Sequence, residues 1–200
     1  KDLGKLREAE ISTRKAIAIN PHFADAHSNL GAILKDLGKL REAEISTRKA
    51  IKINPDLAMA YSNLGGILRG LGKFQKAEIY TRKAIEINPY LSMAHSNLGG
   101  ILRDLGKLRE AEISTREAIE INPNYSDANF NLSDLLCDLG KLDELIILSK
   151  STIESKSINK GYKLLASIRI TIANLLKGNF SETLLGINKS NELIDQEAIN

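Results

Sequence analysis

The chain of 200 residues is poor in the residues that define several large classes of protein. A single cysteine, Cys137, excludes an internal disulfide framework and favours a reducing compartment such as the cytoplasm. Four prolines and 14 glycines exclude collagen-like and low-complexity chains. No apolar run approaches the roughly 20 residues that span a bilayer, and no signal-peptide pattern is visible. We therefore expect a cytoplasmic protein that does not enter the membrane.

Charge of one sign is also scarce. The chain has 28 basic and 25 acidic residues, which gives a net charge of +3. A balance this even lacks the basic excess of nucleic-acid-binding domains, so we expect no nucleic acid among its partners. Apolar residues make up 42% of the chain, which is ordinary for a folded protein.

What the sequence does have is an internal repeat. The dipeptide Asn-Pro recurs every 34 residues, starting at Asn20, Asn54, Asn88 and Asn122. Leu-Gly-Lys recurs with the same period from Leu3 onward. Residues 24–57 and 92–125 are identical at 26 of 34 positions. Such a period indicates that one structural unit is copied along the chain, each copy meeting the same neighbours.

Each copy has the pattern of two helices. In residues 58–91, apolar residues follow one another at steps of three and four, as on one face of a helix. Gly72 interrupts the pattern, a second periodic stretch follows, and Pro89 ends it. Alternation with a period of two is missing, which argues against strands.

This helix–turn–helix pattern resembles the tetratricopeptide repeat (TPR) family. The matching residues in 58–91 are Tyr61, Leu64-Gly65, Leu68, Gly72, Ala77, Ala84 and Pro89. The match covers residues 1 to about 148 and departs from the family mainly in having His at the fourth position of two repeats and Thr at the twenty-fourth. The resemblance, which extends to long bacterial arrays, implies an all-α fold: a right-handed superhelical solenoid of 34-residue repeats.

The period also divides the chain. Lys1 falls at the twelfth position of a repeat, so we expect a segment of a longer protein. The expected parts are the C-terminal part of a truncated repeat at 1–23, repeats at 24–57, 58–91 and 92–125, a degenerate repeat at 126–159, and a further helix pair at 160–200. Gly178 lies four residues beyond its expected place, which we attribute to a slip in the polar stretch 149–160. The last pair is interpreted either as a cap or as a lead-in to a further domain.

The resemblance implies that the first helix of each pair lines a concave groove. Its sixth position carries a column of asparagines: Asn29, Asn63, Asn97 and Asn131. An amide can pair with both groups of a peptide backbone, as in the similar superhelix of O-linked N-acetylglucosaminyltransferases, but it can equally tie neighbouring helices together. The twelfth position carries a basic column: Lys35, Arg69 and Arg103. These cations either attract an acidic ligand or pair locally with Asp36 and Asp104.

Catalytic patterns are missing. His27 and His95 lie two repeats apart, about 20 Å at helix-packing distances, so they cannot share a metal ion. No nucleophile–base arrangement or phosphate-binding loop stands out, and we expect no cofactor and no enzyme activity in this segment. The predicted function is a scaffold that binds a protein or an extended peptide segment in its groove. The alternative is a substrate-presenting arm of a glycosyltransferase or other transferase that lies outside the segment.

Overall fold

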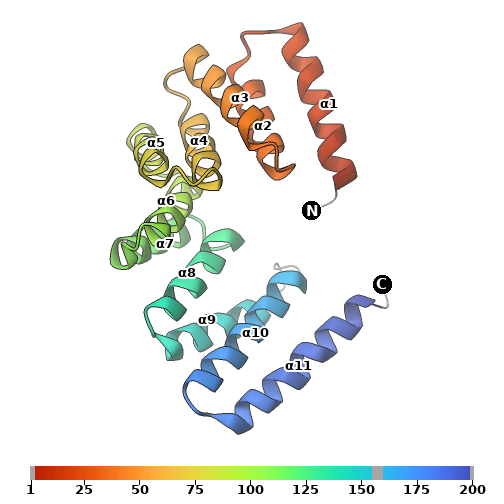
Figure 1. Ribbon diagram of the computed structural model, residues 1–200, viewed down its shortest axis with the longest axis vertical. Coiled ribbons are helices and arrows are strands. Elements are labelled where there is room, and N and C mark those ends of the chain that lie inside the picture. Colours follow the sequence, from red (N-terminus) through yellow and green to blue (C-terminus); the bar gives the residue numbers. More distant parts are fainter. Residues whose placement is uncertain (1–2, 155–159, 199–200) are drawn as a thin grey trace. The chain divides into compact units, whose positions relative to one another are not determined.

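The computed structural model describes residues 3–154 and 160–198, and these form eleven α-helices and no strand (Figure 1). The chain divides into two compact units, residues 1–121 and 122–200. The first unit holds α1 (Leu3–Ile19), α2 (Ala24–Asp36), α3 (Leu40–Ile53), α4 (Ala58–Gly70), α5 (Phe74–Ile87), α6 (Ser92–Asp104) and α7 (Leu108–Ile121). The second holds α8 (Ser126–Asp138), α9 (Leu142–Glu154), α10 (Lys160–Leu176) and α11 (Phe180–Ala198). The predicted all-α fold of consecutive helix pairs is confirmed.

A glycine in the left-handed conformation ends the first helix of each pair. Gly72, for example, has a φ of 71°. The N–H of Lys73 then donates to the carbonyl of Leu68 at 2.9 Å, which closes the end of α4. Only glycine adopts this backbone without a steric cost, so the repeated Leu-Gly-Lys is the signal that turns the chain back into the second helix.

Within each pair of the first unit, the two helices approach closely where glycine faces threonine. A Cβ added at Gly31, Gly65 or Gly99 would lie about 2 Å from the hydroxyl of Thr47, Thr81 or Thr115, respectively. All three threonines are fully buried. The threonine that departs from the family pattern therefore occupies the space that an aromatic residue would fill.

Successive pairs of the first unit meet through the first helix of the later pair, which packs on both helices of the earlier one: α4 on α2 and α3, and α6 on α4 and α5. The backbones of α3, α5 and α7 stay apart. We call the side of α2, α4 and α6 the inner face and the side of α3, α5 and α7 the outer face. Long side chains bridge neighbouring second helices, as Arg14 of α1 does to Glu42 of α3 at 3.2 Å.

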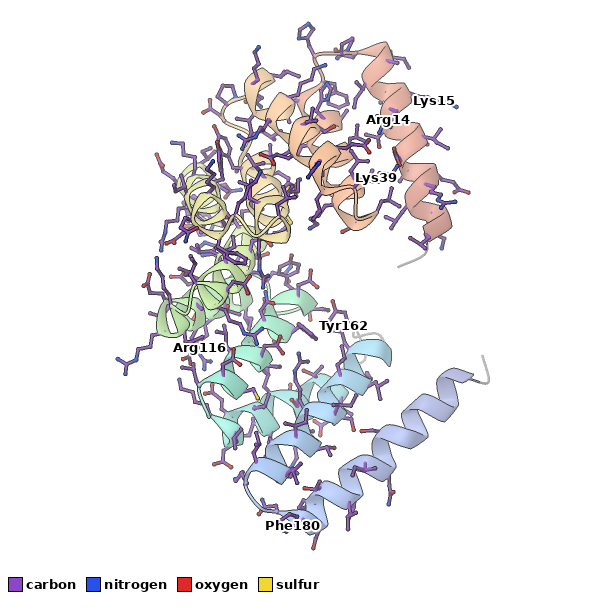
Figure 2. All side chains as sticks on the ribbon, viewed as in Figure 1. Arg14, Lys15, Lys39, Arg116, Tyr162 and Phe180 are labelled. Atoms are coloured by element: carbon purple, nitrogen blue, oxygen red, sulfur yellow. The ribbon has the colours of Figure 1, made fainter. Side chains whose placement is uncertain are left out.

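A ladder of ion pairs joins each turn to the second helix before it. Glu10 accepts from Arg14 of its own helix and from Lys39, the residue before α3. Arg14 and Lys39 are labelled in Figure 2. Lys73 repeats this contact with Glu44, and Lys107 repeats it with Glu78, each at 2.9 Å. The bond from Lys39, followed by that from Arg14, holds the pKa of Glu10 below its ordinary value. Glu10, Glu44 and Glu78 of the second helices are thus each paired with a residue of the same helix and with the lysine of the next turn.

The second unit explains the displaced glycine of the last pair. Arg169 of α10 pairs with Asp134 of α8 across 35 residues, the spacing that also joins Arg69 to Asp104, so the polar stretch does not shift the period. α10 instead has 17 residues where α8 has 13. The four extra residues add about one helical turn and move Gly178 by four positions. The expectation that the polar stretch displaces this glycine is therefore wrong. The longer helix exposes an apolar stripe made of Leu165, Ile168, Ile172, Leu175 and Leu176.

Two neighbouring glycines provide a test of the close approach in the first unit. We expect Gly65→Ala to lower the free energy of unfolding by about 1–3 kcal/mol, because the methyl group collides with Thr81. Gly66→Ala should raise it by about 0.5–1 kcal/mol, because the added Cβ has no neighbour closer than 3.7 Å and alanine favours the helix. Urea unfolding of both variants measures the difference, and equal shifts would contradict the Gly–Thr explanation.

Candidate binding face of the first unit

The asparagine column ties consecutive first helices together. Nδ2 of Asn63 donates to the hydroxyl of Ser28 at 3.0 Å and lies 3.4 Å from the backbone carbonyl of the same residue. Asn97 makes the same contacts to Ser62, at 3.1 and 3.2 Å. Asn63 is buried and Asn97 is half-buried. The amide donors of both residues are therefore engaged within the protein.

The amide oxygens remain as the groups that can take a ligand. In the described part of the chain, Oδ1 of Asn63 and Oδ1 of Asn97 have no hydrogen-bond partner. An amide oxygen accepts from an N–H group, so each residue can take one hydrogen bond from a peptide backbone. If an asparagine amide paired with both the N–H and the C=O group of a peptide backbone, its hydrogen bond to serine would have to break.

The other two asparagines lie in different surroundings. Asn29, on α2 at the start of the column, is exposed. Asn131 is half-buried on α8 of the second unit and has an interaction partner within the protein. The structure thus brings Asn29, Asn63 and Asn97 onto the inner face of the first unit.

The basic column lies in the last turns of the first helices, where a cation interacts favourably with the helix dipole. Arg69 forms an ion pair with Asp104 of the next repeat, with 2.6 Å between Nε and Oδ2. Its guanidinium occupies the space above Gly100, where an added Cβ would lie 2.3 Å from it. Arg103 is half-buried at the end of α6 and also has an interaction partner.

Lys35 differs from Arg69 because the acidic partner is missing. The residue 35 positions further along the chain is Gly70, whereas for Arg69 it is Asp104. Among the described residues, Lys35 forms no ion pair or hydrogen bond. A single glycine therefore interrupts the pairing between repeats and leaves an ammonium group half-exposed on the inner face.

A recess of about 560 Å³ opens at this interruption, lined by Lys35, Leu40, Gly66, Arg69, Gly70, Phe74 and Asp104. A Cβ at Gly66 would lie 3.8 Å from Nζ of Lys35 and 3.7 Å from Nδ2 of Asn97. The ammonium and the amide thus flank one glycine. Three of the residues singled out from the sequence, Lys35, Arg69 and Asn97, meet around this recess.

The histidines are part of the packing. Nε2 of His27 lies 3.1 Å from the carbonyl of Pro21, and Nε2 of His95 donates to the carbonyl of Pro89 at 2.8 Å. Within the ranges that the structure describes, no group of three metal-ligating side chains occurs. Cys137 is half-buried. In those ranges, too, no helix combines the length and apolarity needed to cross a bilayer.

Two features of the inner face were not predicted from the sequence. The serine before each asparagine is the partner of the next asparagine, a relation visible only as a spacing of 35 instead of 34. The same spacing joins Arg69 to Asp104. A search for charged residues 35 apart could have shown that Gly70 breaks the series.

The paired helices and the period define a helical-repeat protein of the kind that serves as an interaction scaffold. Three models described as tetratricopeptide repeat match the sequence, one at residues 24–57 and 58–91, one at 94–125 and one at 115–146. Together they cover more than half of the chain. The chain belongs to the tetratricopeptide repeat family, and the scaffold role follows from that membership. No curated protein matches the sequence.

Solved structures share this fold. YrrB, a TPR protein with an unusual peptide-binding site, superposes with a TM-score of 0.66 at 22% identity, over 90% of this chain and 91% of its own. TTC0263, a thermophilic TPR protein of Thermus thermophilus, gives 0.77 at 20% identity, over 84% of this chain and 92% of its own. PilF of Pseudomonas aeruginosa gives 0.72 at 21% identity, over 95% and 85%.

The contact between Asn63 and Ser28 can be tested by substitution. We expect Asn63→Ala to lower the free energy of unfolding by about 1–3 kcal/mol, because the buried hydroxyl of Ser28 loses its donor. The double variant Asn63→Ala/Ser28→Ala should cost less than the sum of the two single variants. Thermal and urea unfolding of the four proteins measure the coupling. Strictly additive costs would show that the contact contributes nothing to joining the repeats.

Proposed function

We propose that the inner face of the first unit holds an extended segment of a partner protein, with an acidic side chain of that segment seated against Lys35. The observation that carries the proposal is the ammonium of Lys35, which has no ion-pair partner in the described residues and borders a recess of about 560 Å³. A carboxylate is the group that such an ammonium binds best.

The surroundings of Lys35 support an extended backbone beside the seated side chain. Gly66 has no side chain, and an added Cβ there would have no neighbour closer than 3.7 Å, so a ligand backbone can approach α4 closely at this residue. The oxygens of Asn63 and Asn97 offer acceptors at successive repeats. An extended chain rises about 3.3 Å per residue and packed helices lie about 10 Å apart, so roughly every third ligand residue meets an asparagine.

The apolar walls of the recess indicate a second feature of the ligand. Leu40 and Phe74, at the beginnings of α3 and α5, line the recess beside the charged groups. We therefore expect an apolar side chain close to the acidic one. YrrB, which shares the fold, has a peptide-binding site. The transferase-arm alternative and the narrower likeness to O-linked N-acetylglucosaminyltransferases stay predictions.

The substitution Gly70→Asp tests the proposed binding of a carboxylate by Lys35, because it gives Lys35 the acidic partner that Arg69 has in Asp104. Asp104 shows that aspartate fits this position of the repeat and pairs with the preceding cation. Phage display of random octapeptides on the unaltered protein should select peptides with one Asp or Glu near an apolar residue. Gly70→Asp should weaken the selected peptide by about 5–30-fold, because an ion pair is lost and a like charge is added.

Lys35→Gln provides the matched control, since it removes the charge without adding the opposite one and should weaken the same peptide by about 2–5-fold. Circular dichroism should show unchanged helix content in both variants. Selection of peptides without acidic residues would refute the carboxylate seat alone. If no peptide were enriched at all, the proposal that this face holds an extended segment would be wrong.

A further inference from the structure

The outer face of the first unit contains a groove that the proposed function does not use. It lies between α5 and α7, over α6, and has a volume of about 460 Å³. Ile85, Leu98 and Ile113 form its apolar walls, and His95 lies at its floor. The groove exists because the backbones of the second helices stay apart. We call it the outer groove.

The same space is filled one repeat earlier. There Tyr61 and Tyr80 replace His95 and Ser114, and their rings stack at 6.3 Å between centroids. Arg48 lies 5.3 Å from the Tyr80 ring and also donates to its hydroxyl at 3.0 Å. The change from a pair of tyrosines to histidine and serine therefore opens the groove, while the backbone of the repeat stays the same.

A twin groove of about 300 Å³ lies between α1 and α3. It has His27 at its floor and Ile17, Leu30 and Ile45 in its walls, each 68 residues before its counterpart in the outer groove. The two grooves thus share their apolar part and offer a comparison within one molecule.

The rims of the two grooves differ in charge. Among the residues that line the outer groove, Glu86, Glu110 and Glu117 outnumber Arg82, and Glu86 also pairs with Lys83 next to the groove. In the twin groove, Ala18 replaces Glu86 and Lys49 replaces Glu117, whereas the pair Arg14–Glu42 is equivalent to Arg82–Glu110. The carboxylates of the outer groove have partners within the protein, such as His95 for Glu117 at 3.0 Å, but they are largely exposed and can accept further bonds.

We propose that the outer groove is a second binding site, which takes a protein segment with an aliphatic side chain flanked by lysine or arginine. The aliphatic side chain enters between Ile85 and Ile113, and the flanking cations meet Glu86 and Glu117 at the rim. A volume of about 460 Å³ lies within the range of sites that enclose small ligands. Charge complementarity selects the outer groove over its twin, whose walls are the same.

The test uses the unaltered chain with isoleucine methyl groups labelled for NMR. The probe is the pentapeptide Ala-Arg-Leu-Arg-Ala, acetylated and amidated, and the controls carry glutamate in place of both arginines or serine in place of leucine. We expect the basic peptide to shift the methyl signals of Ile85 and Ile113, and to leave those of Ile17 and Ile45 in place. The shifts should weaken as salt is added, because the rim charges are exposed.

Variants that exchange the rim residues of the two grooves then separate the effect of charge on peptide binding from the effect of groove shape. Glu86→Ala/Glu117→Lys gives the outer groove the rim of its twin and should weaken the peptide by at least about fivefold. Ala18→Glu/Lys49→Glu should make the peptide shift Ile45. His95→Tyr/Ser114→Tyr, which reproduces the natural pair of the preceding repeat, should fill the groove and abolish the shifts at Ile113 while the protein stays folded.

Three results would overturn the proposal. These are an absence of shifts at Ile85 and Ile113 at millimolar peptide, equal shifts in both grooves, and binding that survives both the rim exchange and the tyrosine pair. Because the inner face is untouched by these variants, the acidic peptide selected with it should bind all of them as it binds the unaltered protein. The two sites are therefore tested separately.

Discussion

The contact between glycine and threonine inside each helix pair is the constraint on which the first unit depends. Because Gly65 has no side chain, α4 and α5 approach until the hydroxyl of Thr81 occupies the place of a Cβ. This distance sets the width of a pair, and each pair then packs with both of its helices on the first helix of the next pair. The second helices are left apart, so the inner and outer faces acquire different chemistry from one repeated sequence.

On both faces, the repeats act as a uniform framework in which single substitutions create sites. Asp104 pairs with Arg69, but glycine at position 70 leaves Lys35 without its counterpart. Tyr80 fills the outer face, but serine at position 114 leaves a groove. A site in such an array is therefore found by comparing equivalent positions and asking which copy lacks the partner that the others have.

The sequence predicted the helices and their order well, because a period of 34 with a glycine at each turn leaves little freedom. The resemblance to the repeat family was also enough to assign Lys35, Arg69 and the asparagines to one face. It could not show that the donors of Asn63 and Asn97 are engaged by Ser28 and Ser62, because that contact depends on the offset between stacked helices. The sequence also did not reveal the length of α10, because a slip in the polar stretch and a longer helix would displace Gly178 by the same four residues.

That longer helix shows how such an array tolerates change. Four added residues rotate the end of a helix by about 400°, which is close to one full revolution, so each following side chain keeps nearly its former direction. An insertion of two residues in the same place would turn the following side chains toward the opposite side. Length changes within these helices are therefore expected to be close to whole turns: segments of three, four or seven residues can be gained or lost without exchanging the buried and exposed sides, whereas one or two residues turn the following side chains by about 100° to 200°.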